Sequence, residues 1–243
     1  MSKRMAGVLA AVLFAAVAVY ASDVWKDKDF ENWDQKDVDK ILKDSPWTKQ
    51  VQYGGGGSGA MDAPFSQPAS ESAHDNISNG GKLSASQGTA GSAGMGAATN
   101  FFVRWYSSRT VRAAMARQRE MKGTSADEAR KNLTTEMDTY EIVVQSTNLS
   151  TFSKEGEESL KEHSYIMLKS NKDKIAPTRV IVQKGQGDRA VAVVYDFARK
   201  SASGEPTIAP TEKGVEFFTK AGNTPLTVSF DITKMVDKKG QDY

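Results

Sequence analysis

Three acidic residues lie within runs typical of β-strands: Glu141, Asp196 and Asp231. Two carboxylates facing each other across a groove can serve as general acid and nucleophile or base, as in glycoside hydrolysis. Acidic side chains on an antiparallel sheet are also ordinary solvated residues. A concave pocket with two facing carboxylates and a raised pKa would favour a hydrolase. A continuous apolar or aromatic groove would favour a partner-binding surface.

Other enzyme signatures are missing from the sequence. The chain has no Cys, so thiol chemistry is excluded, and its two His residues are far apart, at His74 and His163. No phosphate- or dinucleotide-binding glycine motif stands between a strand and a helix. We therefore expect no catalytic residue, metal ligand or cofactor, and a non-enzymatic protein is favoured.

The four tryptophans lie in two short segments of the chain. Their rings could line a groove that stacks on sugars or on a partner peptide. Buried core rings are the more frequent arrangement, and the sequence favours that interpretation. These candidate partner-binding residues are Trp25, Trp33, Trp47 and Trp105.

Arginines near the second tryptophan segment form another candidate site. Clustered guanidinium groups recognise carboxylates and phosphates. The 32 basic and 30 acidic residues fall to 30 of each once Lys3 and Arg4 are set aside, so net charge gives no support for a nucleic-acid partner. A solvated helix face is the favoured interpretation. The candidates are Arg104, Arg109 and Arg112, with Arg117 and Arg119 nearby.

The segment WDQKDVDKILKDSPW predicts a capped helix. Asp34 has the position of an N-cap residue and Asp37 that of its capping-box partner, while Trp33 is placed to pack on Val38. Pro46 disfavours a helical conformation at the preceding residue, so the helix should end there.

Two strand-like runs, at 49–53 and 101–107, are separated by a segment rich in Gly, Ser and Ala. This segment, 54–100, has few apolar residues and is predicted to be disordered. Residues 22–53 are too few to form a core alone. We therefore predict that the two runs pair in one sheet, because a longer loop adds only about 0.6 kcal/mol of closure entropy per doubling.

The rest of the chain predicts a single α+β domain with an antiparallel sheet or open sandwich of about seven to eight strands and three to four helices. Its main part is 101–236, followed by a C-terminal tail at 237–243. Helices are expected at 110–121, 125–139 and 154–162. Strands are expected at 140–146, 164–169, 178–184, 190–198, 214–219 and 225–232.

The N-terminus has the pattern of a secretory signal peptide. Lys3 and Arg4 precede an apolar run, and small residues stand before Ser22. We expect cleavage of residues 1–21 and a periplasmic or extracellular protein with no membrane contact afterwards. An uncleaved N-terminal anchor is the alternative.

The motifs DVDKILKDSPWTK (37–49) and VRWYSSRTVRAA (103–114), with Trp25 and Trp33, resemble a family of uncharacterised exported bacterial proteins. The resemblance implies that both motifs belong to one domain, and it implies no activity. We expect an exported, non-enzymatic binding or structural module of the cell envelope, whose partner is an envelope or extracellular protein or glycan. The alternative is a carboxylate-based hydrolase acting on an envelope or extracellular polymer.

Overall fold

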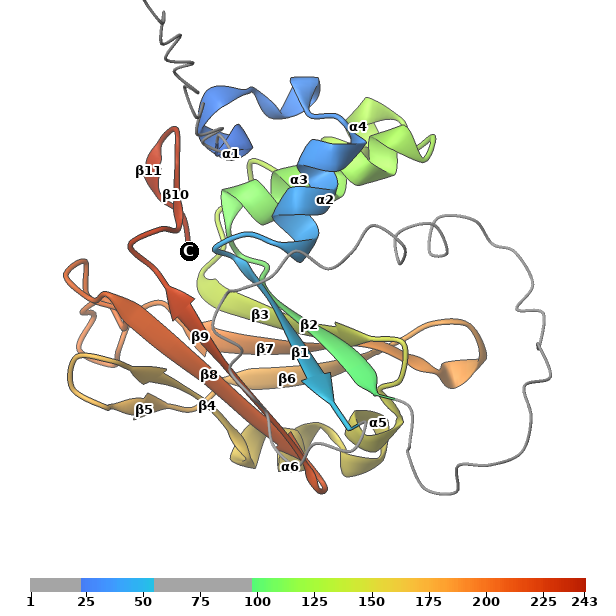
Figure 1. Cartoon of the computed structure of the whole chain (residues 1–243). Helices are drawn as coiled ribbons and strands as arrows, with labels where there is room; N and C mark the ends of the chain where they lie inside the picture. Colours follow the sequence, from blue (N-terminus) through green and yellow to red (C-terminus); the bar gives the residue numbers. More distant parts are fainter. Residues whose placement is uncertain (1–22, 55–97) are drawn as a thin grey trace, which may run out of the picture.

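The computed structural model describes residues 23–54 and 98–243. Its helices and antiparallel sheets confirm the α+β class (Figure 1). The expected signal peptide and most of the segment predicted to be disordered lie outside the described residues.

The predicted pairing across the long insertion is confirmed. Strand β1 (Thr48–Tyr53) runs antiparallel to β2 (Thr99–Trp105), with Thr48 opposite Arg104 and Tyr53 opposite Thr99. Residues 99 and 100, which were assigned to the disordered segment, thus form the start of β2.

Two sheets form the body of the domain, one with the order β1-β2-β3-β7-β6 and the other with the order β5-β4-β8-β9. Their strands are all antiparallel. The remaining strands are β3 (Thr139–Ser146), β4 (Ser164–Leu168), β5 (Lys174–Ile175), β6 (Arg179–Lys184), β7 (Ala190–Ala198), β8 (Gly214–Ala221) and β9 (Thr224–Asp231).

The core lies between the two sheets. The Tyr195 and Phe217 rings meet edge to face across it at 5.1 Å, and the Trp105 and Phe230 rings do so at 5.2 Å. A hydrogen bond of 2.8 Å also joins the Tyr195 hydroxyl on β7 to the Thr219 hydroxyl on β8. The arrangement is the open sandwich, one of the two architectures that the strand pattern left open.

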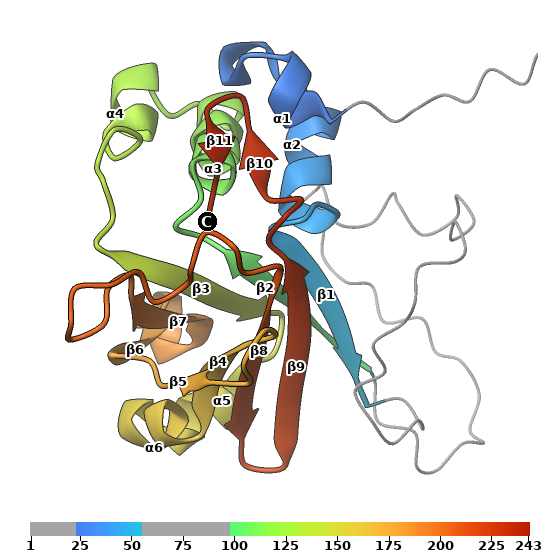
Figure 2. The same ribbon diagram turned by 90° about the vertical axis from the view of Figure 1, so that its left-hand side faces the viewer.

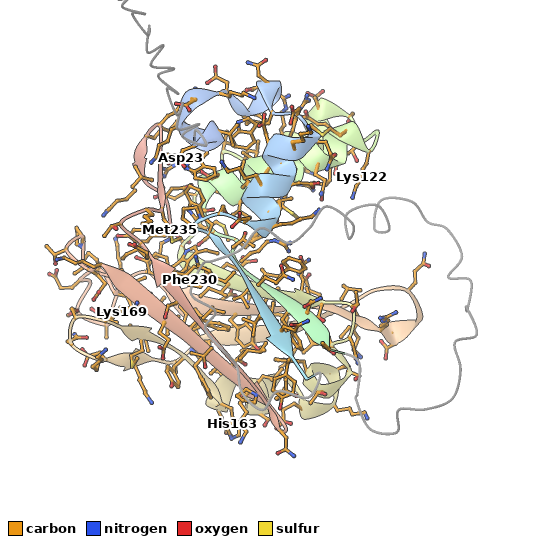
Figure 3. All side chains as sticks on the ribbon, viewed as in Figure 1. Asp23, Lys122, His163, Lys169, Phe230 and Met235 are labelled. Atoms are coloured by element: carbon orange, nitrogen blue, oxygen red, sulfur yellow. The ribbon has the colours of Figure 1, made fainter. Side chains whose placement is uncertain are left out.

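Helices close the two ends of this sandwich. Helices α1 to α4 gather at one end, and α5 and α6 lie at the opposite end (Figures 1 and 2). In Figure 3, Asp23 and Lys122 mark the first end and His163 the second. The helices are α1 (Val24–Asp27), α2 (Gln35–Lys43), α3 (Arg109–Met121), α4 (Ala126–Arg130), α5 (Ser150–Glu155) and α6 (Glu157–Glu162), with short 3₁₀ helices η1 (Phe30–Asn32) and η3 (Gln186–Asp188).

The capping box predicted for α2 is present. The Asp34 carboxylate accepts from the Asp37 backbone N–H at 2.9 Å, and the Asp37 carboxylate accepts from the Asp34 N–H at 3.2 Å. Trp33 and Val38 are 3% and 0% exposed and belong to the same core. The local sequence therefore fixes both the start of α2 and the face that it buries.

Two predicted helices have different bounds in the structure. The helix expected over 125–139 ends at Arg130 and has Ser125 as its N-cap. The helix expected over 154–162 is two helices that meet at Gly156, whose φ of 83° breaks the helical path. The domain also contains more helices and strands than the sequence predicted, since several are only two to six residues long.

The expected C-terminal tail is instead part of the domain. Strands β10 (Val236–Asp237) and β11 (Gly240–Gln241) form a small hairpin beside α1 and α3 (Figures 1 and 2). Asp242 is 1% exposed, and its backbone carbonyl accepts from the Trp47 indole N–H at 2.5 Å. The tryptophan that follows α2 in the sequence therefore contacts the end of the chain.

Candidate functional site

All four tryptophans are core residues. Their side chains are between 0% and 5% exposed, so a ligand outside the domain does not reach the rings. Trp25 and Trp47 meet edge to face at 5.2 Å, and Trp105 contacts Tyr140 in the same way at 5.8 Å. The burial agrees with the interpretation that the sequence favoured, and the tryptophans form no stacking groove.

Two of the three candidate arginines hold the fold together. Arg109 pairs with both carboxylate oxygens of Asp237, at 2.9 Å and 2.8 Å, which fastens α3 to the C-terminal hairpin. The Arg112 Nη1 donates to the backbone carbonyls of Asn132 and Thr135, at 3.2 Å and 2.7 Å. Arg112 thus differs from the solvated residue that the sequence suggested.

Arg104 has a different environment. Its Nε donates to the Leu42 carbonyl at 2.7 Å, which caps the C-terminus of α2, and its Nη1 donates to the Gln145 amide oxygen. A guanidinium has five N–H donors. Among residues 23–54 and 98–243, no carboxylate forms an ion pair with Arg104, and burial lowers its pKa to about 10. It remains a cation at neutral pH without an anionic partner in this part of the chain.

The strand pairing places Arg104 beside an acidic residue. Arg104 lies opposite Val143 on β3, and Glu141 and Gln145 are two residues away on either side. Because side chains two apart share a face of a sheet, all four lie on the outer face of the five-stranded sheet. The intervening residues, Ile142 and Val144, point into the core.

Glu141 and Asp196 are directly opposite each other on β3 and β7. Burial, and after it the neighbouring Asp196 charge, raise the pKa of Glu141 to about 7, while Arg179 and Arg112 oppose the shift. Asp196 is 2% exposed and accepts from the Arg179 Nε at 2.7 Å through Oδ2. Its Oδ1 is buried and has no hydrogen-bond partner within residues 23–54 and 98–243.

A pocket of about 170 Å³ lies on this outer face. It is small beside the 300 to 1,000 Å³ that is typical of sites for drug-sized ligands. Polar and apolar groups share its wall about equally, with the apolar contacts coming from Met115 of α3 and Val143 of β3 among others. The lining residues are Arg104, Tyr106, Met115, Glu141, Val143, Gln145 and Gln183.

The sequence identified Arg104 and Glu141 but placed them in different hypotheses. Arg104 was grouped with other arginines, and Glu141 with Asp196 and Asp231. Asp231 is on the other sheet, at the end of β9, where it accepts from Thr233. Tyr106, Gln145 and Gln183 were missed, because they become neighbours only through pairing of β2, β3, β7 and β6.

The described residues offer no metal centre of three or more His, Cys, Asp or Glu side chains, and no helix among them is long and apolar enough to cross a membrane. Comparison with protein-family models, with curated proteins and with solved structures finds no match for this chain. The fold and the site thus define a two-sheet antiparallel α+β domain with a small pocket on one outer sheet face, lined by polar and apolar groups that include Arg104.

Proposed function

We propose that this chain is an exported, non-enzymatic binding module whose ligand site is the pocket on the outer face of the five-stranded sheet. The observation that supports it most directly is Arg104, a partly buried cation that lines the pocket without a carboxylate partner among the described residues. Burying a charge costs free energy unless an opposite charge compensates it. A ligand that supplies the missing anion would therefore gain from this arrangement.

The alternative function is a carboxylate-based hydrolase. It is favoured by the pairing of Glu141 with Asp196 and by the raised pKa of Glu141, because a general acid with a pKa near the working pH is effective. A second carboxylate must also reach the substrate. Asp196 does not line the pocket, is 2% exposed, and is ion-paired to Arg179. The binding module therefore fits the geometry better.

The test compares ligand retention by the wild type and by Arg104→Gln. Each protein is incubated with a small-molecule and glycan extract of the cell envelope and examined by native mass spectrometry. We expect the wild type and the control Arg119→Gln to retain a ligand that Arg104→Gln does not. Arg119 bonds the carbonyls of Met115 and Ala129 and is not among the residues that line the pocket.

The hydrolase predicts a different outcome. Envelope polymers incubated with the wild type would be cleaved, and Glu141→Gln would abolish the cleavage. If no ligand depends on Arg104 and an envelope polymer is cleaved only when Glu141 is present, the hydrolase replaces the binding proposal.

The cellular location and the partner class belong to the same proposal. The signal-like N-terminus and the resemblance to exported bacterial proteins support a periplasmic or extracellular module that binds an envelope or extracellular protein or glycan. Secreted material is expected to begin at Ser22. Secreted protein that retains Met1 would contradict cleavage of the signal.

A further inference from the structure

We infer that the pocket binds a carboxylate group, held by the Arg104 guanidinium and by the carboxyl group of Glu141, both of which line it. The inference rests on the proposed function, because it names the ligand class of the same site. It follows from the charges, donors and size of the pocket.

The charges around the pocket favour an anion. Arg104 and Glu141 line the pocket, and the charges of Asp196, Arg179 and Arg112 lie close enough to Glu141 to affect its pKa. Arg179 is already paired with Asp196, and Arg112 is bonded to backbone carbonyls. Arg104 keeps donors without a partner in the described part of the chain. Its guanidinium lies over the Phe102 ring, 5.1 Å from the centroid, but forms no ion pair with a described residue. One cation without an ion pair matches a single negative charge, which favours a carboxylate over a phosphate with nearly two charges.

Glu141 completes the site as a donor. The groups that face it are Asp196 of β7, Arg179 of β6 and Arg112 of α3, with Arg104 and Tyr106 along the pocket wall. Burial and the Asp196 charge raise its pKa to about 7, so its carboxyl is substantially protonated at neutral pH. A protonated carboxyl can donate one O–H to a ligand oxygen. A bound anion next to it would favour this protonated form further.

The other lining groups and the volume limit the size of the ligand. Gln145 and Gln183 carry amides that can donate to an oxygen or accept from a hydroxyl, and Tyr106 carries a hydroxyl. A pocket of about 170 Å³ holds a small acid or the carboxylate end of a larger molecule. A free hydroxy acid and an acidic sugar share this chemistry.

Calorimetric titration of the mature chain at pH 6, 7 and 8 tests the inference. The probes are lactate, glucuronate, inorganic phosphate and methylammonium. We expect a carboxylate to bind. Tighter binding of lactate would indicate a free hydroxy acid as the ligand, and tighter binding of glucuronate would indicate an acidic sugar. Arg104→Gln should weaken binding roughly 10- to 100-fold, as expected for loss of a charge-assisted hydrogen bond, while the control Arg119→Gln should not.

The pH dependence supplies a second readout. If binding needs the protonated carboxyl, affinity should fall by up to about tenfold per pH unit above a pKa of about 7. Glu141→Gln retains a donor that does not titrate, so its affinity should not change with pH. If thermal melts show that Arg104→Gln is unfolded, the pH dependence of carboxylate binding by Glu141→Gln tests the inference instead.

Four results would overturn the inference: no binding of either carboxylate, preference for phosphate or methylammonium, affinity that is independent of Arg104, or equal pH dependence in the wild type and Glu141→Gln. The proposal that the chain is a binding module is tested separately from this ligand class. An Arg104-dependent ligand from the envelope extract that is not a carboxylate would refute only the ligand class.

Discussion

Glu141 and Asp196 stand opposite each other on neighbouring strands, yet their surroundings differ. Arg179 compensates the charge of Asp196, whereas no side chain pairs directly with Glu141 among the described residues. Like charges at directly opposed positions of a sheet are destabilising. The pair therefore avoids carrying two charges by keeping Glu141 partly protonated.

This arrangement makes stability depend on pH. The folded pKa of Glu141, about 7, is above the ordinary value of 4.5, so the folded state binds more protons between these values and its free energy of unfolding falls as the pH rises. Glu141→Gln cannot ionise at this position, so it does not lose this stability as the pH rises. It should gain stability relative to the wild type from pH 4.5 to 7, by at most roughly 3 kcal/mol and by less after solvent screening.

Urea unfolding at several pH values measures this difference. Glu205→Gln, at an exposed loop position, is the matched substitution. A constant difference between the wild type and Glu141→Gln across this range would show that Glu141 has no raised pKa in the folded protein.

The tryptophans give a second prediction for single residues. Trp47 and Trp105 are both 0% exposed, so replacing either ring by Ala leaves a cavity in the core. Each substitution should lower the free energy of unfolding by about 3 to 5 kcal/mol. Met121→Ala, at a 36% exposed position of α3, should change it by no more than about 0.5 kcal/mol. Tryptophan variants as stable as the wild type in thermal melts would refute the core assignment.

At the level of elements, the C-terminal hairpin completes helix α3. The Asp242 carboxylate accepts from the backbone N–H groups of Arg109 and Thr110, at 2.6 Å and 2.9 Å, and the Ser108 hydroxyl accepts from Val111 at 3.1 Å. The first turn of a helix has N–H groups without intrahelical partners. Side chains from two distant parts of the chain thus satisfy three of them.

We expect Asp242→Ala to destabilise the domain by about 1 to 2 kcal/mol, as for loss of an N-cap residue. The effect should also appear as faster amide hydrogen exchange at Arg109 and Thr110. The exposed Glu205→Ala is the control, with a change within about 0.5 kcal/mol. Unchanged exchange at these two amides would show that the hairpin does not cap α3 in solution.

For the whole molecule, residues 23–54 depend on the remainder of the chain. Beyond the β1–β2 pairing, Arg117 donates to the Trp33 carbonyl at 3.0 Å, and the Trp47 indole donates to Asp242. These contacts join the segment to a sheet, to α3 and to the C-terminus. Residues 23–54 are therefore part of the same domain and not an independent unit.

Limited proteolysis tests this dependence. A cut between residues 54 and 98 should leave two fragments that elute together under native conditions, since the contacts on both sides of the cut remain. Denaturant should separate them, as the control. Fragments that elute apart without denaturant would show that residues 23–54 form an independent unit.

Sequence alone determined the features that depend on neighbours along the chain. The capping residues of α2, the end of that helix before Pro46 and the strand runs after residue 100 follow from local hydrogen bonding and backbone sterics. The alternation of apolar and polar residues also identified the paired β1 and β2. These features need no knowledge of the distant chain.

Only the tertiary structure decided which side chains meet. Register across β2, β3 and β7 brings Arg104, Glu141 and Asp196 onto one face, and a shift of one residue would turn each of them to the other side. The charge state of Glu141, and the lack of an ionic partner for Arg104 in the part of the chain that the structure describes, depend on burial and packing that no local pattern encodes. The physical reason is that desolvation and Coulomb interactions depend on distances in space and not on separation along the chain.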